Sequence, residues 1–383
     1  MIFIVTLFLI LFQILKIQNS THNMMLTVRQ LCRLSQKKSL CSCTARLFDP
    51  GNVVRQHHWN KGQNQLVLNA NGTNFHYFKK AACRQYNKDV GTKADLVKAI
   101  GYRCEWRHNY TAHDAILYAL GVGVSTTQSD YLKFLFEKDD NFCVLPSYGF
   151  IPAQKEVLLL TLEGRLPGLA NLDPAKVLHG EQYMEVFRPM LRAATLRNEC
   201  VVVDVIDKRS GALILFDVNT YDDKDTLITY NQFSIFIVGF GGFGGKKTSN
   251  HEKPTIKPPA RPAEYSVSQA TSIDQAALYR LSGDYNPLHF NPTVAARVGF
   301  SKPILHGLCT LAYGIRHVLQ QYANNDVAKF KAVKVRFSKP VYPGQTINTN
   351  MWRDGNRVYF QCEVTETKDV VISGAYVDFH HID

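Results

Sequence analysis

Residues 306–322 read HGLCTLAYGIRHVLQQY, and this stretch decides the fold of the second part of the chain. Its apolar residues recur at intervals of three and four positions, a spacing that gathers side chains on one face of a helix; they are Leu308, Leu311, Ala312, Ile315 and Leu319. Strand-like runs follow it at 333–337, 345–353, 357–365 and 370–379. One long helix followed by consecutive strands predicts a helix wrapped by a curved antiparallel sheet.

An earlier region of similar size shows the same mixture of helix and strand signals. Residues 114–122 (DAILYALGV) predict a short amphipathic helix, and two β-branched runs at 201–206 and 213–218 predict a hairpin. The glycine-rich stretch 239–245 lacks the Lys-Ser/Thr ending of a phosphate-binding loop, so we interpret it as part of a connection. We therefore expect an α+β protein with one unit at 96–240, a Gly/Pro-rich linker at 241–262 and a second unit at 263–383, packed side by side.

Residues 1–95 form a basic N-terminal extension of a different character. The chain has 383 residues and a net charge of +12, yet residues 1–107 hold 16 Lys+Arg and only four acids, while 108–383 hold 28 of each sign. The basic surplus therefore belongs to the N-terminal region and gives no argument for nucleic-acid binding. The nine cysteines are scattered, which indicates reduced thiols, and no metal site is expected.

The extension also raises the question of the compartment. Residues 2–17 are an apolar run that suits an N-terminal membrane or secretory signal, with membrane contact through this segment alone. Residues 1–48 contain no acid, which also suits a mitochondrial presequence. The residues leave these alternatives open.

The chemistry is concentrated in the segment 280–289, which reads RLSGDYNPLH. Asp284 and His289 together can orient one water and remove its proton, and Asn286 offers an amide donor. The competing interpretation is that Asp-x-Asn-Pro only forms a turn. The nearby His306-Gly307 favours a site, because Gly307 offers an unpaired helix-terminal N–H without a side chain to block it. Such an amide is suited to an oxyanion developing on a thioester.

These residues carry a family resemblance. Residues 281–289 with 300–308 resemble the hydratase 2 motif of MaoC-like hot-dog proteins, and 96–383 are similar to the 2-enoyl-CoA hydratase 2 unit of the multifunctional β-oxidation enzymes. The resemblance implies a double hot-dog fold, a homodimer, and reversible hydration of trans-2-enoyl-CoA to (3R)-3-hydroxyacyl-CoA in peroxisomal fatty-acid β-oxidation. It implies no cofactor, because coenzyme A is part of the acyl-CoA thioester substrate.

The resemblance also assigns roles to residues. Asp284 and His289 match the catalytic acid/base pair, Asn286 the polar residue beside them, and Gly307 the oxyanion amide. Glu137 falls where the family has a functional glutamate, with a solvated acid in an acidic run as the alternative. The first unit would bind the acyl chain. Five cations are candidates for the CoA phosphates, each with a plain surface charge as the alternative: Lys246, Lys247, Lys334, Arg336 and Lys339.

Two other functions stay open from the sequence. A dehydratase acting on acyl-carrier-protein thioesters would share the fold, and a non-catalytic acyl-CoA-binding protein would share the substrate. The first favours a surface complementary to an acidic partner, whereas residues 108–383 are neutral. The second is disfavoured because Asp284 and His289 are both present.

Overall fold

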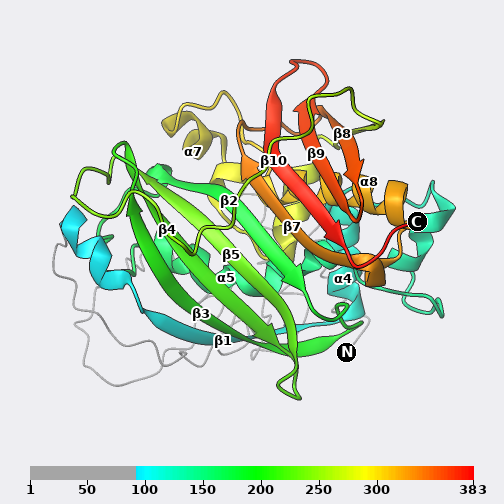
Figure 1. Cartoon of the computed structure of the whole chain (residues 1–383), viewed down its shortest axis with the longest axis horizontal. Helices are drawn as coiled ribbons and strands as arrows, with labels where there is room; N and C mark the ends of the chain where they lie inside the picture. The colour runs from blue at the N-terminus through cyan, green and yellow to red at the C-terminus, as the bar shows by residue number, and fades with distance from the viewer. Residues whose placement is uncertain (1–91) are drawn as a thin grey trace, which may run out of the picture. The chain divides into compact units, whose positions relative to one another are not determined.

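The computed structural model describes residues 92–383, so the expectations for residues 1–91 lie outside the described part of the chain. One antiparallel sheet of ten strands runs through the molecule in the order β1-β3-β4-β5-β2-β7-β10-β9-β8-β6 (Figure 1). The strands are β1 Arg103–Tyr110, β2 Val177–Val186, β3 Ala194–Asp207, β4 Gly211–Tyr221, β5 Leu227–Val238, β6 Tyr265–Ala270, β7 Phe330–Phe337, β8 Thr346–Asp354, β9 Arg357–Val364 and β10 Val370–Phe379.

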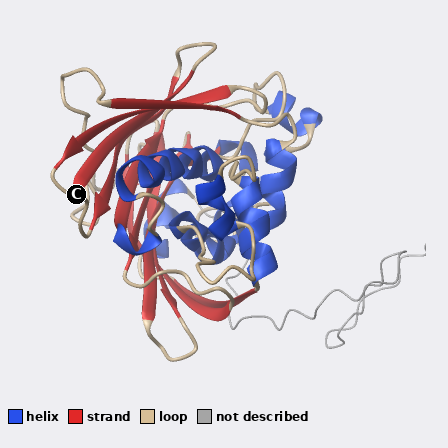
Figure 2. Cartoon of the chain, turned by 90° about the vertical axis from the view of Figure 1, so that its right-hand side faces the viewer, coloured by secondary structure: helices blue, strands red, loops and turns tan. Residues whose placement is uncertain are grey.

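The helices gather on the concave side of this curved sheet, as Figure 2 shows. The α-helices are α4 Ala112–Gly121, α5 Phe150–Leu162, α6 Gln275–Tyr279, α7 Pro292–Arg297 and α8 Gly307–Ala323. Short 3₁₀ helices connect them at Lys93–Ala99, Ser129–Phe134, Pro146–Gly149, Pro174–Lys176, Arg280–Ser282, Pro287–His289 and Val327–Lys329. Within residues 92–383, no helix combines the length and apolar character that a membrane span requires.

The sheet is shared by two units. In the first, β1, β3, β4, β5 and β2 pack against α5; in the second, β7, β10, β9 and β8 pack against α8, and β6 pairs with β8 at the edge of the sheet. The units join where β2 pairs with β7, with Gln182 opposite Val335. The expected α+β arrangement of two sheet-wrapped helices is therefore confirmed. The expected linker at 241–262 falls between the end of β5 and the start of β6.

The helix α8 forms the core of the second unit. Leu311, Ile315 and Val318 are fully or almost fully buried, and each such side chain contributes about 1.5–3 kcal/mol of transfer free energy. A Cβ at Gly314 would lie 2.9 Å from a ring carbon of Phe360, so a glycine lets this helix approach β9 closely. This packing fixes the position of the first turn of α8.

Polar side chains of the second unit bind the C-terminal end of α4. The amide of Gln275 donates to the Gly121 carbonyl at 2.6 Å. The guanidinium of Arg316 donates through Nε to Val122 at 2.8 Å, and Gln269 donates to Gly123 at 2.8 Å. The last carbonyls of a helix lack intrahelical donors and carry negative partial charge, so these contacts satisfy them. They also hold the two units in one arrangement.

Candidate active site

The segment with Asp284, Asn286 and His289 is a shaped loop between the 3₁₀ helix Arg280–Ser282 and α7. Gly283 begins it with a φ of 132°, a conformation that favours glycine. The side-chain oxygen of Asn286 accepts from the Leu288 N–H at 3.1 Å and so caps the 3₁₀ helix Pro287–His289. The Asp-x-Asn-Pro segment thus forms a turn, and Asn286 retains its amide N–H₂ as a donor. The turn is what brings Asp284 and His289 together.

The carboxylate of Asp284 and the imidazole of His289 lie close together in a largely buried position. Asp284 is 9% exposed, and its Oδ1 accepts from the Asn286 N–H at 3.2 Å. The Nδ1 of His289 lies 2.9 Å from the Ile304 carbonyl oxygen. Because a carbonyl only accepts, Nδ1 carries the proton and Nε2 has a free lone pair. The carboxylate and imidazole atoms of Asp284, His289 and His306 lie within 4.8 Å of one another.

Burial sets the charge state of the imidazole. Desolvation lowers the pKa of His289 below its ordinary value, and the negative charge of Asp284 opposes part of this shift. A neutral imidazole with a free Nε2 can accept a proton near neutral pH. The pair thus offers one carboxylate and one base on the same side of the loop.

Gly307 is the first residue of α8, with His306 at the N-cap. Its amide belongs to the first four N–H groups of the helix, which have no intrahelical acceptor. A Cβ at this position would lie 3.2 Å from two ring carbons of Phe337. The glycine therefore fits a close approach and leaves its amide unobstructed by a side chain. Its chain neighbour His306 stacks on His289, so Gly307 is one residue away from a side chain that contacts the imidazole of His289.

Two residues of this region were not among the sequence candidates. His306 is 1% exposed and its ring stacks on His289, with 3.8 Å between the ring centroids. The guanidinium of Arg280 lies 5.1 Å from the ring centroids of both Tyr285 and Phe290. Within residues 92–383, Arg280 forms no ion pair with a carboxylate. Arg280 directly precedes the motif and His306 lies within it, but only the folded loop reveals their contacts.

The five cations predicted from the sequence all have carboxylate partners. Lys246 pairs with Asp204 at 3.1 Å, Lys247 with Asp207 at 3.4 Å, and Lys339 with Asp369. Lys334 and Arg336 both pair with Glu181, at 2.7 and 2.6 Å. Lys334 is only 1% exposed, which corrects its expected role: a buried, paired ammonium is part of the β2–β7 junction and does not face a phosphate in solvent. The others remain exposed.

Glu137 lies on an exposed turn that follows the 3₁₀ helix Ser129–Phe134. Its carboxylate does not belong to the cluster of Asp284, His289 and His306. Within the described residues it forms no hydrogen bond or ion pair. The fold therefore does not join Glu137 to the acid/base pair, and its position matches the alternative of a solvated acid.

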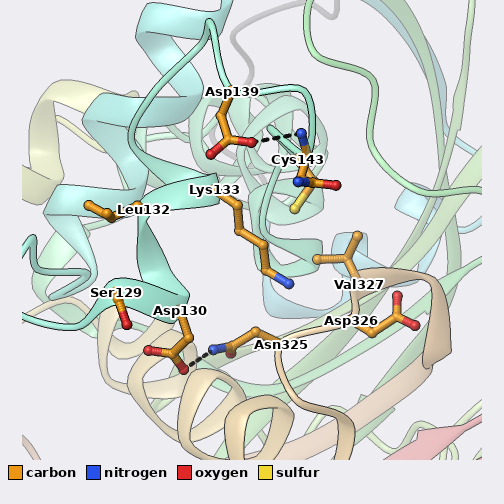
Figure 3. A pocket seen from close by; sticks show the side chains of 10 residues that line it. Ser129, Asp130, Leu132, Lys133, Asp139, Cys143, Asn325, Asp326 and Val327 are labelled. Atoms are coloured by element: carbon orange, nitrogen blue, oxygen red, sulfur yellow. Dashed lines mark hydrogen bonds between the residues drawn. The ribbon is translucent and has the colours of Figure 1, made fainter.

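A cavity of about 570 Å³ lies elsewhere, beyond the C-terminal end of α8. Figure 3 shows the Lys133 side chain extending into it, with Asp130, Asp139 and Asp326 around it. These carboxylates already have hydrogen-bond donors within the protein. Asp130 accepts from the Asn325 amide at 2.8 Å, and Asp139 and Asp326 accept from backbone N–H groups of their own turns. Asp284, His289 and His306 lie together at the opposite end of α8, so the candidate site is distinct from this cavity.

Asp284, His289 and His306, all within the described residues 92–383, also form a cluster of side chains of the types that can bind a metal ion. Imidazoles that share one metal ion radiate from it, each with a ring nitrogen toward the ion. Here the two rings lie face to face, with an interplanar angle of 29°. The stacked geometry suits proton transfer next to a carboxylate better than coordination.

Comparison with known proteins follows the same division of the chain. Residues 108–239 match the family model of the MFE-2 hydratase 2 N-terminal domain, and residues 254–375 match that of the MaoC like domain. A solved MaoC-like dehydratase from Phytophthora capsici is 33% identical with a TM-score of 0.66, and the match covers 75% of this chain and 98% of that one.

Two curated relatives extend the comparison. The peroxisomal multifunctional enzyme type 2 of Mus musculus is 53% identical over 284 residues, and the match covers 74% of this chain but 38% of that protein, so the chain spans well under half of that relative. The probable enoyl-CoA hydratase 2 of Dictyostelium discoideum is 38% identical over 283 residues, covering 73% of this chain and 94% of that protein. The chain therefore belongs to the enoyl-CoA hydratase 2 family, with the hydratase 2 N-terminal and MaoC-like domains side by side.

Proposed function

We propose that this protein reversibly hydrates trans-2-enoyl-CoA to (3R)-3-hydroxyacyl-CoA in fatty-acid β-oxidation. The observation that carries the proposal is the meeting of Asp284 and His289 with His306, the residue at the N-cap of α8. The relatives named enoyl-CoA hydratase 2 and multifunctional enzyme type 2 support the same reaction.

The acid/base pair acts on one water. The carboxylate of Asp284 and Nε2 of His289 hold the water, whose oxygen bonds to C3 of the enoyl thioester as its proton is removed. The electron pair of the C2–C3 double bond moves toward C2 and the thioester oxygen, and a proton is then delivered to C2. The hydroxyl on C3 and the hydrogen on C2 together account for the water added. General acid–base catalysis of this kind contributes about 10²–10⁴-fold.

The amide of Gly307 receives the negative charge of the thioester oxygen. It is a fixed backbone donor at the positive end of a helix, so it needs little reorganisation as the charge develops. Burial of the surrounding groups strengthens this interaction, because little water competes for the oxygen. The amide N–H₂ of Asn286 is a second donor, on the loop that also holds Asp284 and His289.

Arg280 is the cation that we assign to the phosphates of coenzyme A. It differs from the five cations predicted from the sequence because it has no carboxylate partner within residues 92–383. Tyr285 and Phe290, which are 59% and 57% exposed, flank it with aromatic faces. A guanidinium suits phosphate, and exposed rings suit the adenine of the same ligand. The acyl chain is assigned to the first unit.

The homodimer and the peroxisomal compartment belong to the same proposal. The names of the Mus musculus and Drosophila melanogaster relatives support the compartment. Imaging of the full chain against peroxisomal and mitochondrial markers tests the compartment. Light scattering of the purified protein tests the dimer.

The reaction is tested with the full chain, crotonyl- and decenoyl-CoA, and a coupled (3R)-specific dehydrogenase. Asp284→Asn and His289→Ala are expected to lower kcat by at least about 10²-fold. The exposed Asp274→Asn is the matched control and is expected to keep the wild-type rate. Turnover of acyl-carrier-protein thioesters alone would instead indicate a dehydratase of that class. Binding of the thioester by a folded protein without turnover would indicate a binding protein.

A further inference from the structure

Two hydrogen bonds cross between the catalytic loop and the segment that enters α8. His289 belongs to the loop and donates to the carbonyl of Ile304, in the entering segment, at 2.9 Å. His306 belongs to the entering segment, and its Nε2 lies 3.2 Å from the carbonyl oxygen of Asp284 in the loop. Because that carbonyl only accepts, Nε2 of His306 carries the donated proton. Each segment thus holds the backbone of the other.

The environment of His306 makes this contact rigid. Its ring lies between His289, at 3.8 Å between centroids, and Tyr279, at 4.8 Å. Burial, reinforced by the neighbouring His289, holds the pKa of His306 well below the ordinary value. The ring is therefore neutral at physiological pH and keeps one N–H for the Asp284 carbonyl.

The second nitrogen shows that packing alone does not explain this residue. Nδ1 of His306 is buried and has no hydrogen-bond partner within the described residues. A buried polar atom left unpaired costs about 1–3 kcal/mol. A phenylalanine would fill the same space between two rings without that cost. The presence of an imidazole at position 306 is therefore explained by the hydrogen bond that its Nε2–H donates to the Asp284 carbonyl.

We propose that His306 is a positioning residue for the hydration: its Nε2–H fixes the backbone of Asp284 at a set distance from the amide of Gly307. Gly307 follows His306 directly in the chain, so one residue ties the acid to the oxyanion donor. This inference rests on the proposed function. A displacement of about 1 Å between catalytic groups can cost about 10²-fold in rate.

Two substitutions separate the donor from the ring. His306→Gln keeps an N–H near the position of Nε2, and His306→Phe keeps a stacked ring without a donor. We expect His306→Phe to lower kcat by about 10–100-fold with KM changed less than about threefold, the pattern of a group that acts in the transition state. We expect His306→Gln to retain kcat within about tenfold of wild type. His317→Gln is the control, since His317 is a buried histidine of the same helix that binds Thr349 and Gln269 instead.

Each outcome decides the proposal. Wild-type kcat in His306→Phe overturns it, and so does a loss in His306→Gln as large as that in His306→Phe. If His306→Phe fails to fold, His306→Gln decides alone: a 100-fold loss at an unchanged unfolding temperature overturns the proposal. An inactive wild type refutes the proposed function, and full activity in Asp284→Asn refutes the role of Asp284 in it. Both are distinguishable from the two results above.

Discussion

The buried histidines predict a steep loss of stability on mild acidification. Burial lowers the pKa of His317 to about 3 and that of His108 and His179 to about 4. In the unfolded chain these imidazoles titrate near 6.5. Between about pH 6.5 and pH 4 the unfolded state therefore binds more protons than the native state, so the free energy of unfolding falls as the pH falls.

The magnitude follows from the number of protons. Each group contributes about 1.4 kcal/mol per pH unit inside this window, so the three together remove about 4 kcal/mol between pH 6 and pH 5. His289 and His306 shift in the same direction and add to the loss. A total stability of about 5–15 kcal/mol makes such a loss easy to measure. Carboxylates titrate lower, near pH 4 in the unfolded chain, and contribute little above pH 5.

Urea unfolding at pH 7.5, 6.5, 6.0, 5.5 and 5.0 provides the measurement. His317→Gln should reduce the slope of the free energy of unfolding by about 1.4 kcal/mol per pH unit below pH 6, whatever its stability at neutral pH. The exposed Gln321 has no titratable side chain and serves as the control, since Gln321→Ala should leave the slope unchanged. A wild-type stability that stays level from pH 6.5 to 5, or a His317→Gln slope equal to that of wild type, would refute the reasoning.

Three further substitutions test the junction, the core and the ligand contact. Glu181→Gln leaves the buried ammonium of Lys334 without its carboxylate and should lower the free energy of unfolding by about 3–5 kcal/mol in urea. Gly314→Ala places a Cβ 2.9 Å from Phe360 and should cost about 1–3 kcal/mol in the same assay, although alanine favours a helix. Arg280→Ala should raise KM for crotonyl-CoA about tenfold and leave KM for crotonyl-pantetheine unchanged, because the latter has no phosphates; equal effects on both thioesters contradict the assignment.

The second unit was predictable because its signals are local. The expected helix at 306–322 is observed as Gly307–Ala323, and the four expected strands are observed as β7 to β10 with small shifts at their ends. The amphipathic stripe and the alternating strands each report one buried face. Such a pattern predicts the same helix or strand in any tertiary arrangement that buries that face.

The helix α5 was not predicted, although it is the core helix of the first unit. Its residues 150–162 read FIPAQKEVLLLTL, with a proline in the first turn and a run of leucines near the end. Phe150, Ala153, Val157 and Leu160 are buried, but the flanking Leu158 and Leu159 blur the apolar stripe. A helix that is apolar around most of its surface has no clear period, so only its burial in the fold identifies it.

The candidate site divides in the same way. Asp284, Asn286, His289 and Gly307 lie in two short segments whose turn and helix start can be recognised locally. The partners of the five cations come from strands and loops distant in sequence, so ion pairing could not be foreseen. The role of His306 depends on a contact across 22 residues that the two segments make only when folded.

A line of aromatic rings connects the first unit to the candidate site of the second. Tyr148, in the 3₁₀ helix Pro146–Gly149 before α5, contacts Tyr118 at 5.3 Å between centroids, and Tyr118 contacts Tyr279 at 6.0 Å. Tyr279 in turn packs on His306, which stacks on His289. These rings contribute to the burial that lowers the pKa of His289 and His306. The candidate acid/base residues thus lie in the second unit, while Tyr148 and Tyr118 of the first unit extend the line of packed rings behind them.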